Sequence, residues 1–182
     1  RYGAQIHTHY PQTIEEEIAI MDQERSRFPD DDTITIPQFI KEILAELTLE
    51  ARKSSEINQR SGVSVRVSIS NYETLLSNAV RRSIRHGDEC TCPRVSDLPY
   101  IVSSFGGKIE LETFEEGREG RLMEDLSKRA VLRTFGQYFD VADLEDIVTS
   151  FDLGNVADTG DEKRASEYPE LVSKLDGLSA AV

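Results

Sequence analysis

Apolar residues recur at three- and four-residue steps along most of the chain, which is the spacing of one face of an α-helix. The pattern predicts a mainly α protein. We expect helices over residues 13–27, 37–54, from about Arg66 to Gly87, 118–139 and around 168–176, with a short helix starting at Ser96 or Asp97. In the helix over 118–139 the candidate core residues are Leu122, Leu126, Ala130, Leu132 and Phe135.

Helix ends are marked by local signals. Thr13 followed by Glu16 is a capping-box pattern, in which the side chain of each residue accepts a hydrogen bond from the backbone N–H of the other. Ser70 and Glu73 repeat this spacing in the third helix. Gly87 after a basic run is typical of a helix stop, because glycine tolerates the left-handed backbone that ends many helices.

Two segments alternate apolar and polar residues and predict short strands. One is "AQIHTHY", read as a strand over residues 4–8 before Pro11, and the other is a β segment near 107–113. The backbone of a strand needs partner strands, and no other strand is predicted in the hundred residues after the first one. We therefore expect the chain to be a fragment of a longer protein whose sheet precedes residue 1.

Charge and cysteine content exclude several classes of protein. With 21 Lys and Arg against 34 Asp and Glu, the net charge of −13 argues against a general binder of nucleic acid or anionic membranes. No apolar stretch approaches the ~20 residues that a membrane helix needs. The two cysteines, Cys90 and Cys92, are too few for a disulfide framework and favour a reducing cytoplasm.

Histidines and cysteines offer two candidate metal sites, neither of which we predict to bind a metal. His7 and His9 would share a face of a strand, but no third ligand accompanies them. His86, Cys90 and Cys92 form the second set, with three potential ligands, an unusual C-x-C spacing and no fourth ligand. We interpret the first pair as polar surface or packing and the second set as a loop.

Arg66 stands near the start of a helix, where the positive end of the helix dipole disfavours a cation. The placement is understandable if an anion such as a phosphate binds there, held by free backbone N–H groups and the guanidinium. The alternative is a surface arginine paired with one of the many carboxylates. Arg81, Arg82 and Arg85 also allow two interpretations: a basic patch for an acidic partner, or cations favoured by the negative end of a helix dipole.

An ordered set of segments carries a family resemblance. The set "RYGAQIHTHYP", "IAIMDQE", "ARKSSEINQRSGVSVRVSISNYETLLSNAVRRS", "PRVSDLP" and "GGKIELE" resembles the magnesium-chelatase-like and MoxR-like branch of AAA+ ATPases over residues 1–138. The resemblance implies the end of the AAA+ core at 1–10, a helical lid domain at 11–105 and a family-specific extension at 106–152. Residues 153–182 would follow as a flexible connector and a terminal helix, with 153–166 as the mobile part.

The resemblance also implies roles for two arginines. "GVSVR" is similar to the family's "GASPR" pattern, which makes Arg66 the sensor arginine that reaches from the lid to the terminal phosphates of ATP. Arg1 would be the finger that reaches a neighbouring subunit's nucleotide, and the alternative for Arg1 is a frayed terminal residue. In the intact protein the resemblance implies ATP and Mg²⁺ as cofactors and a homo-oligomeric ring. It further implies a protein partner of chelatase or von Willebrand factor A type.

The phosphate-binding G-x-x-x-x-G-K-[ST] loop of the family is absent from these residues, so we expect this chain alone not to hydrolyse ATP. Two functions remain open. The chain is either the lid and extension of an ATPase that remodels a partner or inserts a metal into a porphyrin, or a non-catalytic helical protein-interaction module.

Overall fold

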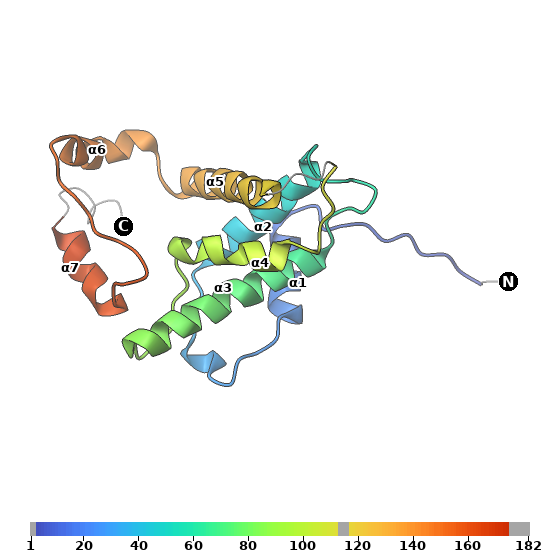
Figure 1. The fold of residues 1–182 in the computed structure, drawn as a ribbon, viewed down its shortest axis with the longest axis horizontal. Coiled ribbons are helices and arrows are strands. Elements are labelled where there is room, and N and C mark those ends of the chain that lie inside the picture. The colour runs from blue at the N-terminus through green and yellow to red at the C-terminus, as the bar shows by residue number, and fades with distance from the viewer. Residues whose placement is uncertain (1–2, 113–116, 175–182) are drawn as a thin grey trace.

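A computed structural model describes residues 3–112 and 117–174, and these residues are mainly helical, as expected (Figure 1). The α-helices are α1 (Ile14–Glu24), α2 (Gln38–Lys53), α3 (Val65–His86), α4 (Val102–Phe105), α5 (Arg118–Tyr138), α6 (Glu145–Asp152) and α7 (Tyr168–Ser173). Four 3₁₀ turns within the described residues connect them: η1 (Asp31–Thr33), η2 (Val95–Ile101), η3 (Val141–Leu144) and η4 (Ala165–Glu167).

The core lies where α1, α2 and α3 pack together and α5 covers α2 (Figure 1). Helix α2 contributes the most regular face, because its buried residues follow the predicted spacing: Ile40, Ile43, Leu44, Leu47 and Ala51. Tyr72, Leu75, Leu76 and Ala79 do the same for α3. Removing these side chains from water is the main favourable term in the folding of such a bundle.

The face of α5 departs from the prediction in its second half. Leu122, Leu126 and Ala130 are buried, but Leu132 is 72% exposed and Phe135 is also exposed. The buried side continues through Thr134 instead, because residues 122, 126, 130 and 134 are spaced by four. The prediction therefore assigned Leu132 and Phe135 to the buried face of α5, although they lie on a different face of the helix.

Helix ends agree with the prediction at Gly87, agree in part at Thr13 and differ at a third place. The Thr13 hydroxyl accepts a hydrogen bond from Glu16 N at 3.2 Å, but the Glu16 carboxylate accepts from Gln12 N at 2.8 Å rather than from Thr13 N. Gly87 ends α3 in the left-handed region with φ of 68°. The predicted capping box of Ser70 and Glu73 is wrong, since α3 begins at Val65 and both residues lie inside it. The Glu73 carboxylate instead accepts from the backbone N–H of Ser26 at 2.7 Å.

Neither predicted strand is present in the described residues. Residues 4–8 are exposed and irregular, and none of the described segments pairs with them. Of the segment near 107–113, residue 113 lies outside the described residues, and Leu111 forms a single antiparallel bridge with Ile57. Asn58 N donates to Glu110 O at 2.8 Å and Glu112 N donates to Glu56 O at 3.0 Å. One such pair fixes a loop but does not extend into a ladder.

The last part of the chain lies to one side of the bundle. In Figure 1, α6 and α7 lie beyond the end of α5, and the loop before α7 approaches the C-terminal end of α3. Helix α7 lies within the predicted range 168–176, of which residues 175 and 176 are outside the described part of the chain. Residues 155–164 between α6 and η4 contain no helix. No helix among the described residues has both the length and the apolar character required to cross a membrane.

Candidate functional site

Arg66 is the second residue of α3, and its side chain is exposed. Val63 and Val67 on either side of it are buried, so the start of the helix is fixed by its neighbours while Arg66 remains in solvent. Among residues 3–112 and 117–174, no carboxylate pairs with Arg66 and no hydrogen bond holds its guanidinium. The alternative of a surface ion pair is therefore not observed in the described part of the chain.

A buried ion pair lies directly behind this helix start. The Glu17 carboxylate is fully buried and accepts from Arg52 Nη1 at 2.8 Å and Nη2 at 3.1 Å. The Ser68 hydroxyl donates to the same carboxylate at 2.5 Å. Arg52 Nε donates to the carbonyl of Val63 at 3.0 Å. Glu17 is on α1, Arg52 on α2 and Ser68 on α3, so one network fixes the first turn of α3 to two other helices.

The N-terminal segment packs against the same network. The guanidinium of Arg52 lies 4.9 Å from the ring centroid of Tyr10 and also donates to the Pro11 carbonyl at 3.4 Å. Gly62 has φ of 67°, and a Cβ at this position would be only 2.5 Å from the Tyr10 hydroxyl. A side chain at position 62 would therefore face both a strained backbone and a displaced tyrosine ring.

The first turn of α3 leaves its backbone donors without a side-chain cap. Ser64 occupies the N-cap position, but its hydroxyl makes no capping hydrogen bond. The free N–H groups and the helix dipole give this end a partial positive charge, and Arg66 adds a full one. The chemistry of this corner of the molecule favours an anion over a cation.

Arg1, the predicted finger arginine, lies outside the described residues. Neither candidate metal set gathers into a site. His7 and His9 are exposed, Cys90 and Cys92 are free thiols, and the described residues contain no group of three His, Cys, Asp or Glu side chains placed to hold a metal ion.

The three arginines near the end of α3 have three different environments. Arg82 is buried, and its Nη2 donates to the fully buried carboxylate of Asp97 at 2.8 Å. Arg81 donates to Asn78 Oδ1 at 2.6 Å and lies 5.1 Å from the ring centroid of Tyr100. Arg85 is exposed and pairs with Glu162. Of the three arginines, Arg82 is therefore a buried structural residue, and the other two are surface cations. Neither the basic patch nor the helix-dipole interpretation predicted the buried one.

A second set of polar contacts connects α1 and α3 at Tyr72, further along α3 than Arg66. The Tyr72 hydroxyl donates to Asp22 at 3.1 Å, and burial, followed by the nearby Asp22 charge, raises the pKa of Tyr72. Arg25 donates two hydrogen bonds of 2.7 Å to Asp31, which lower the pKa of that carboxyl. These groups stabilise the bundle and leave no unpaired charge for chemistry.

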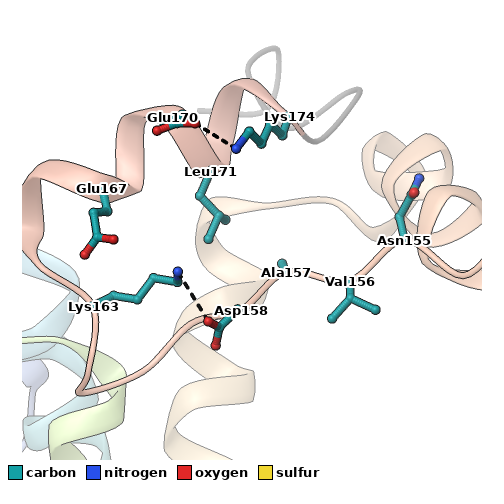
Figure 2. A pocket seen from close by; sticks show the side chains of 9 residues that line it. All are labelled: Asn155, Val156, Ala157, Asp158, Lys163, Glu167, Glu170, Leu171 and Lys174. Atoms are coloured by element: carbon teal, nitrogen blue, oxygen red, sulfur yellow. Dashed lines mark hydrogen bonds and ion pairs between the residues drawn. The ribbon is translucent and has the colours of Figure 1, made fainter.

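Two hollows were not predicted from the sequence. An apolar groove of about 770 Å³ lies between η2 and α5, and its walls include Leu98, Val102, Met123, Val131 and Phe135. A polar hollow of about 420 Å³ lies against α7 (Figure 2). There Lys163 pairs with Asp158 at 3.3 Å and Lys174 with Glu170 at 2.7 Å. The third acidic side chain of the lining, Glu167, accepts a hydrogen bond from the backbone N–H of Arg164 at 2.7 Å.

The residues that position Arg66 were missed from the sequence, although one signal existed. Glu17 lies on the apolar face of α1, between Ile14 and Ile18, where a carboxylate requires a buried partner. No local pattern could have identified Arg52 as that partner, because the pair is 35 residues apart. Asp97 was predicted only as a helix start, and its burial beneath α3 was not foreseen.

Models of known protein families, curated proteins and solved structures were all compared with the chain, and none of them matches it.

Proposed function

We propose that this chain is the helical lid and extension of a magnesium-chelatase-like AAA+ ATPase, in which Arg66 contacts the terminal phosphates of ATP bound by its own subunit. One observation supports this proposal above the others. Arg66 is an exposed arginine without an ion-pair partner in the described residues, on the first turn of a helix whose position is fixed by the buried Glu17–Arg52 pair.

The physical basis is charge placement. An arginine at a helix N-terminus is unfavourable in the absence of an anion and favourable when a triphosphate approaches. Phosphoryl transfer depends on charge stabilisation at positions fixed before the reaction, and the buried network behind α3 supplies that rigidity. The guanidinium would add two parallel donors for phosphate oxygens.

The remaining parts belong to the intact protein. ATP and Mg²⁺ would bind in a core that precedes these residues, subunits would assemble into a homo-oligomeric ring, and Arg1 would reach the neighbouring subunit's nucleotide. The energy of hydrolysis would remodel a protein partner, of chelatase or von Willebrand factor A type, or drive metal insertion. We place the protein in the cytoplasm, and we expect the chain alone to be inactive because it lacks the phosphate loop.

The test uses the intact protein with Arg66→Ala, Arg66→Lys and the matched control Arg60→Ala, an exposed arginine in the preceding loop. Loss of one contact that stabilises the transition state costs about 3 kcal/mol, or roughly a hundredfold in kcat. We expect that loss in Arg66→Ala, partial activity in Arg66→Lys because the charge remains, and wild-type activity in Arg60→Ala. Equal activity of Arg66→Ala and the control would contradict the assignment.

Mixed rings separate the roles of Arg66 and Arg1. Arg1→Ala subunits mixed with subunits that lack the phosphate-loop lysine should recover activity, because some interfaces then contain one intact site. Arg66→Ala mixed with the same lysine variant should recover none, since every subunit's own site is damaged. Equal recovery in both mixtures would show that the roles within and between subunits are assigned wrongly.

The second candidate is a non-catalytic helical interaction module, and the apolar groove between η2 and α5 favours it. Val95, Val102, Leu132 and Phe135 are exposed in or beside this groove, and a cluster of this kind often marks an interaction surface. An intact protein that neither binds nor hydrolyses ATP, but loses a partner on Leu132→Glu, would favour this function over the first.

A further inference from the structure

Residues 160–168 lie against a surface formed by the end of α3 and by η2, and Arg94 is central to the contact. Arg94 Nη1 donates to the carbonyls of Gly160 at 3.1 Å and Lys163 at 2.9 Å. Its guanidinium also lies 4.5 Å from the ring centroid of Tyr168, within the range of a cation–π interaction. Arg94 therefore binds both ends of one segment that is more than sixty residues away in sequence.

Acidic residues of the same segment meet the neighbouring donors. The Tyr100 hydroxyl donates to Asp161 Oδ2 at 3.0 Å, and His86 Nε2 lies 2.6 Å from the Asp161 carbonyl. Arg85 pairs with Glu162. We call Arg85, His86, Arg94 and Tyr100 the docking surface, and residues 160–168 the plug. The docking surface offers cations and aromatic rings, and the plug offers carboxylates, carbonyls and a tyrosine.

The docking surface is built into the bundle. Arg94 N donates to Asp97 Oδ2 at 2.8 Å, and Asp97 is the fully buried partner of Arg82. The main chain of Arg94 is thus held whether or not its side chain is occupied. Arg85 and His86 belong to the last turn of α3, which ends at Gly87. The surface would keep its shape if the plug left.

The contact with the plug, in contrast, is incompletely satisfied. Arg94 Nη2 and Asp161 Oδ1 are both buried atoms for which the described residues provide no hydrogen-bond partner. A buried polar atom without a hydrogen-bond partner costs free energy, which offsets part of the stabilisation that the neighbouring hydrogen bonds contribute. The ion pair of Arg85 with Glu162 lies in solvent, with 56% and 79% of the two side chains exposed, and such pairs contribute little. The plug is therefore held weakly at a surface that could bind a better-fitting segment more tightly.

We propose that the docking surface is a binding site for an acidic segment of a partner protein with an aromatic residue six or seven positions after its carboxylates, and that the plug occupies this site as a displaceable intramolecular competitor. The spacing is that of Asp161 and Glu162 relative to Tyr168. The proposal does not depend on ATP hydrolysis. A competitor in the same chain has a high effective concentration, so it weakens binding of the partner segment without blocking it.

The test measures binding of a fluorescent peptide with the plug sequence GDEKRASEY to three forms of the full chain. The first is the wild type, and the second is an opened variant carrying Asp161→Asn, Glu162→Gln and Tyr168→Ala. The third adds Arg94→Ala to the opened variant. Circular dichroism checks that all three are folded. We expect them to be, because Arg94→Ala retains the hydrogen bond from the backbone N–H of residue 94 to the Asp97 carboxylate. A scrambled peptide with the same composition controls for charge alone.

We expect the peptide to bind the opened variant at least tenfold more tightly than the wild type, and Arg94→Ala to reverse most of that gain. Equal affinity for wild type and opened variant would contradict the role of the plug as a competitor. No binding to the opened variant would contradict the role of the docking surface as a binding site. Hydrogen exchange gives a second measurement on the wild type and on Arg94→Ala alone. Amides of 160–168, part of which the sequence predicted to be mobile, should exchange more slowly in the wild type than in Arg94→Ala, while those of α2 stay unchanged. Equal exchange of 160–168 in the two proteins would also contradict the assignment of the plug.

Discussion

The helical bundle and the plug both use arginine–carboxylate pairs, but in opposite surroundings. In the bundle, Glu17 is fully buried and Arg52 is 11% exposed, and hydrogen bonds from Ser68 and to Val63 satisfy the pair. In the plug, Glu162 and its partner Arg85 lie in solvent. The same two chemical groups therefore fix the position of a helix in one region and hold a segment loosely in the other.

Burial explains the difference. A buried charge cannot be hydrated when its partner is removed, so breaking the pair costs much more than the pair contributes. A solvent-exposed charge regains water and loses little. The bundle should tolerate no change at its ion pair, whereas the plug should open and close without affecting the rest of the fold.

The largest expected effect comes from making one chemical change in both regions. Glu17→Gln leaves the Arg52 charge unpaired inside the bundle and should lower the free energy of unfolding by about 3–5 kcal/mol. Glu162→Gln makes the same replacement in the plug and should leave the urea midpoint at its wild-type value. Urea denaturation followed by circular dichroism measures both. Similar midpoints for the two variants would remove the distinction between the regions.

A pair of leucines on α5 sharpens the comparison without charge. Leu126 is fully buried, and Leu126→Ala should cost about 2–5 kcal/mol through lost burial and a cavity. Leu132 is mostly exposed beside the apolar groove, and Leu132→Ala should change stability by no more than about 0.5 kcal/mol. The same denaturation assay applies. A large loss for Leu132→Ala would mean that this part of α5 is covered in solution.

Tyr72 tests the bundle at high pH. Burial raises the pKa of Tyr72 in the folded chain, while an unfolded tyrosine ionises near pH 10. The stabilisation is therefore complete below about pH 10 and is lost as the pH rises from there through the folded-state pKa. Tyr72→Phe removes the hydrogen bond to Asp22, which costs about 1 kcal/mol at pH 7, but should weaken the loss of stability between pH 9 and 11. Denaturation series at several pH values compare the two slopes, and identical slopes would count against this role.

The smallest effect concerns two thiols on the loop after α3. Burial raises the pKa of the Cys92 thiol, while Cys90 is exposed. Because the thiolate is the reactive form, Cys92 should react several-fold more slowly with a maleimide at pH 8. Labelling rates of Cys90→Ser and Cys92→Ser, each with one thiol left, measure this. Equal rates would indicate that the loop opens as readily as the plug.

Local patterns in the sequence predicted the helices but not what holds them together. The spacing of Ile40, Leu44 and Leu47 gave the buried face of α2, because a helix period determines which side chains share a face. Leu132 was placed wrongly because two apolar stripes on α5 have overlapping periods, and only packing decides which one is covered.

The candidate site shows the same limit. Arg66 was found by its place at a helix start, which is a local property. Its fixed position depends on Glu17 and Arg52, and the plug depends on Arg94 and Tyr168, and both are contacts between distant parts of the chain. The strand predicted at residues 4–8 failed for a related reason, since alternation describes a strand only where a partner is available.

The seam between α2 and α5 has a consequence for how the chain folds. Arg133 Nη1 donates a hydrogen bond to the Glu50 carboxylate at 2.7 Å. It also forms an ion pair with Glu46 at 2.6 Å, but the geometry of that contact is not that of a hydrogen bond. The Tyr138 hydroxyl donates to Glu42 at 2.8 Å, across 96 residues of sequence. Closing so long a loop costs entropy before its contacts form, whereas α1, α2 and α3 are close in sequence. We expect those three helices to assemble first and α5 to dock late, so Arg133→Gln should speed unfolding more than it slows refolding in stopped-flow measurements. Slower refolding at an unchanged unfolding rate would place the docking of α5 early instead.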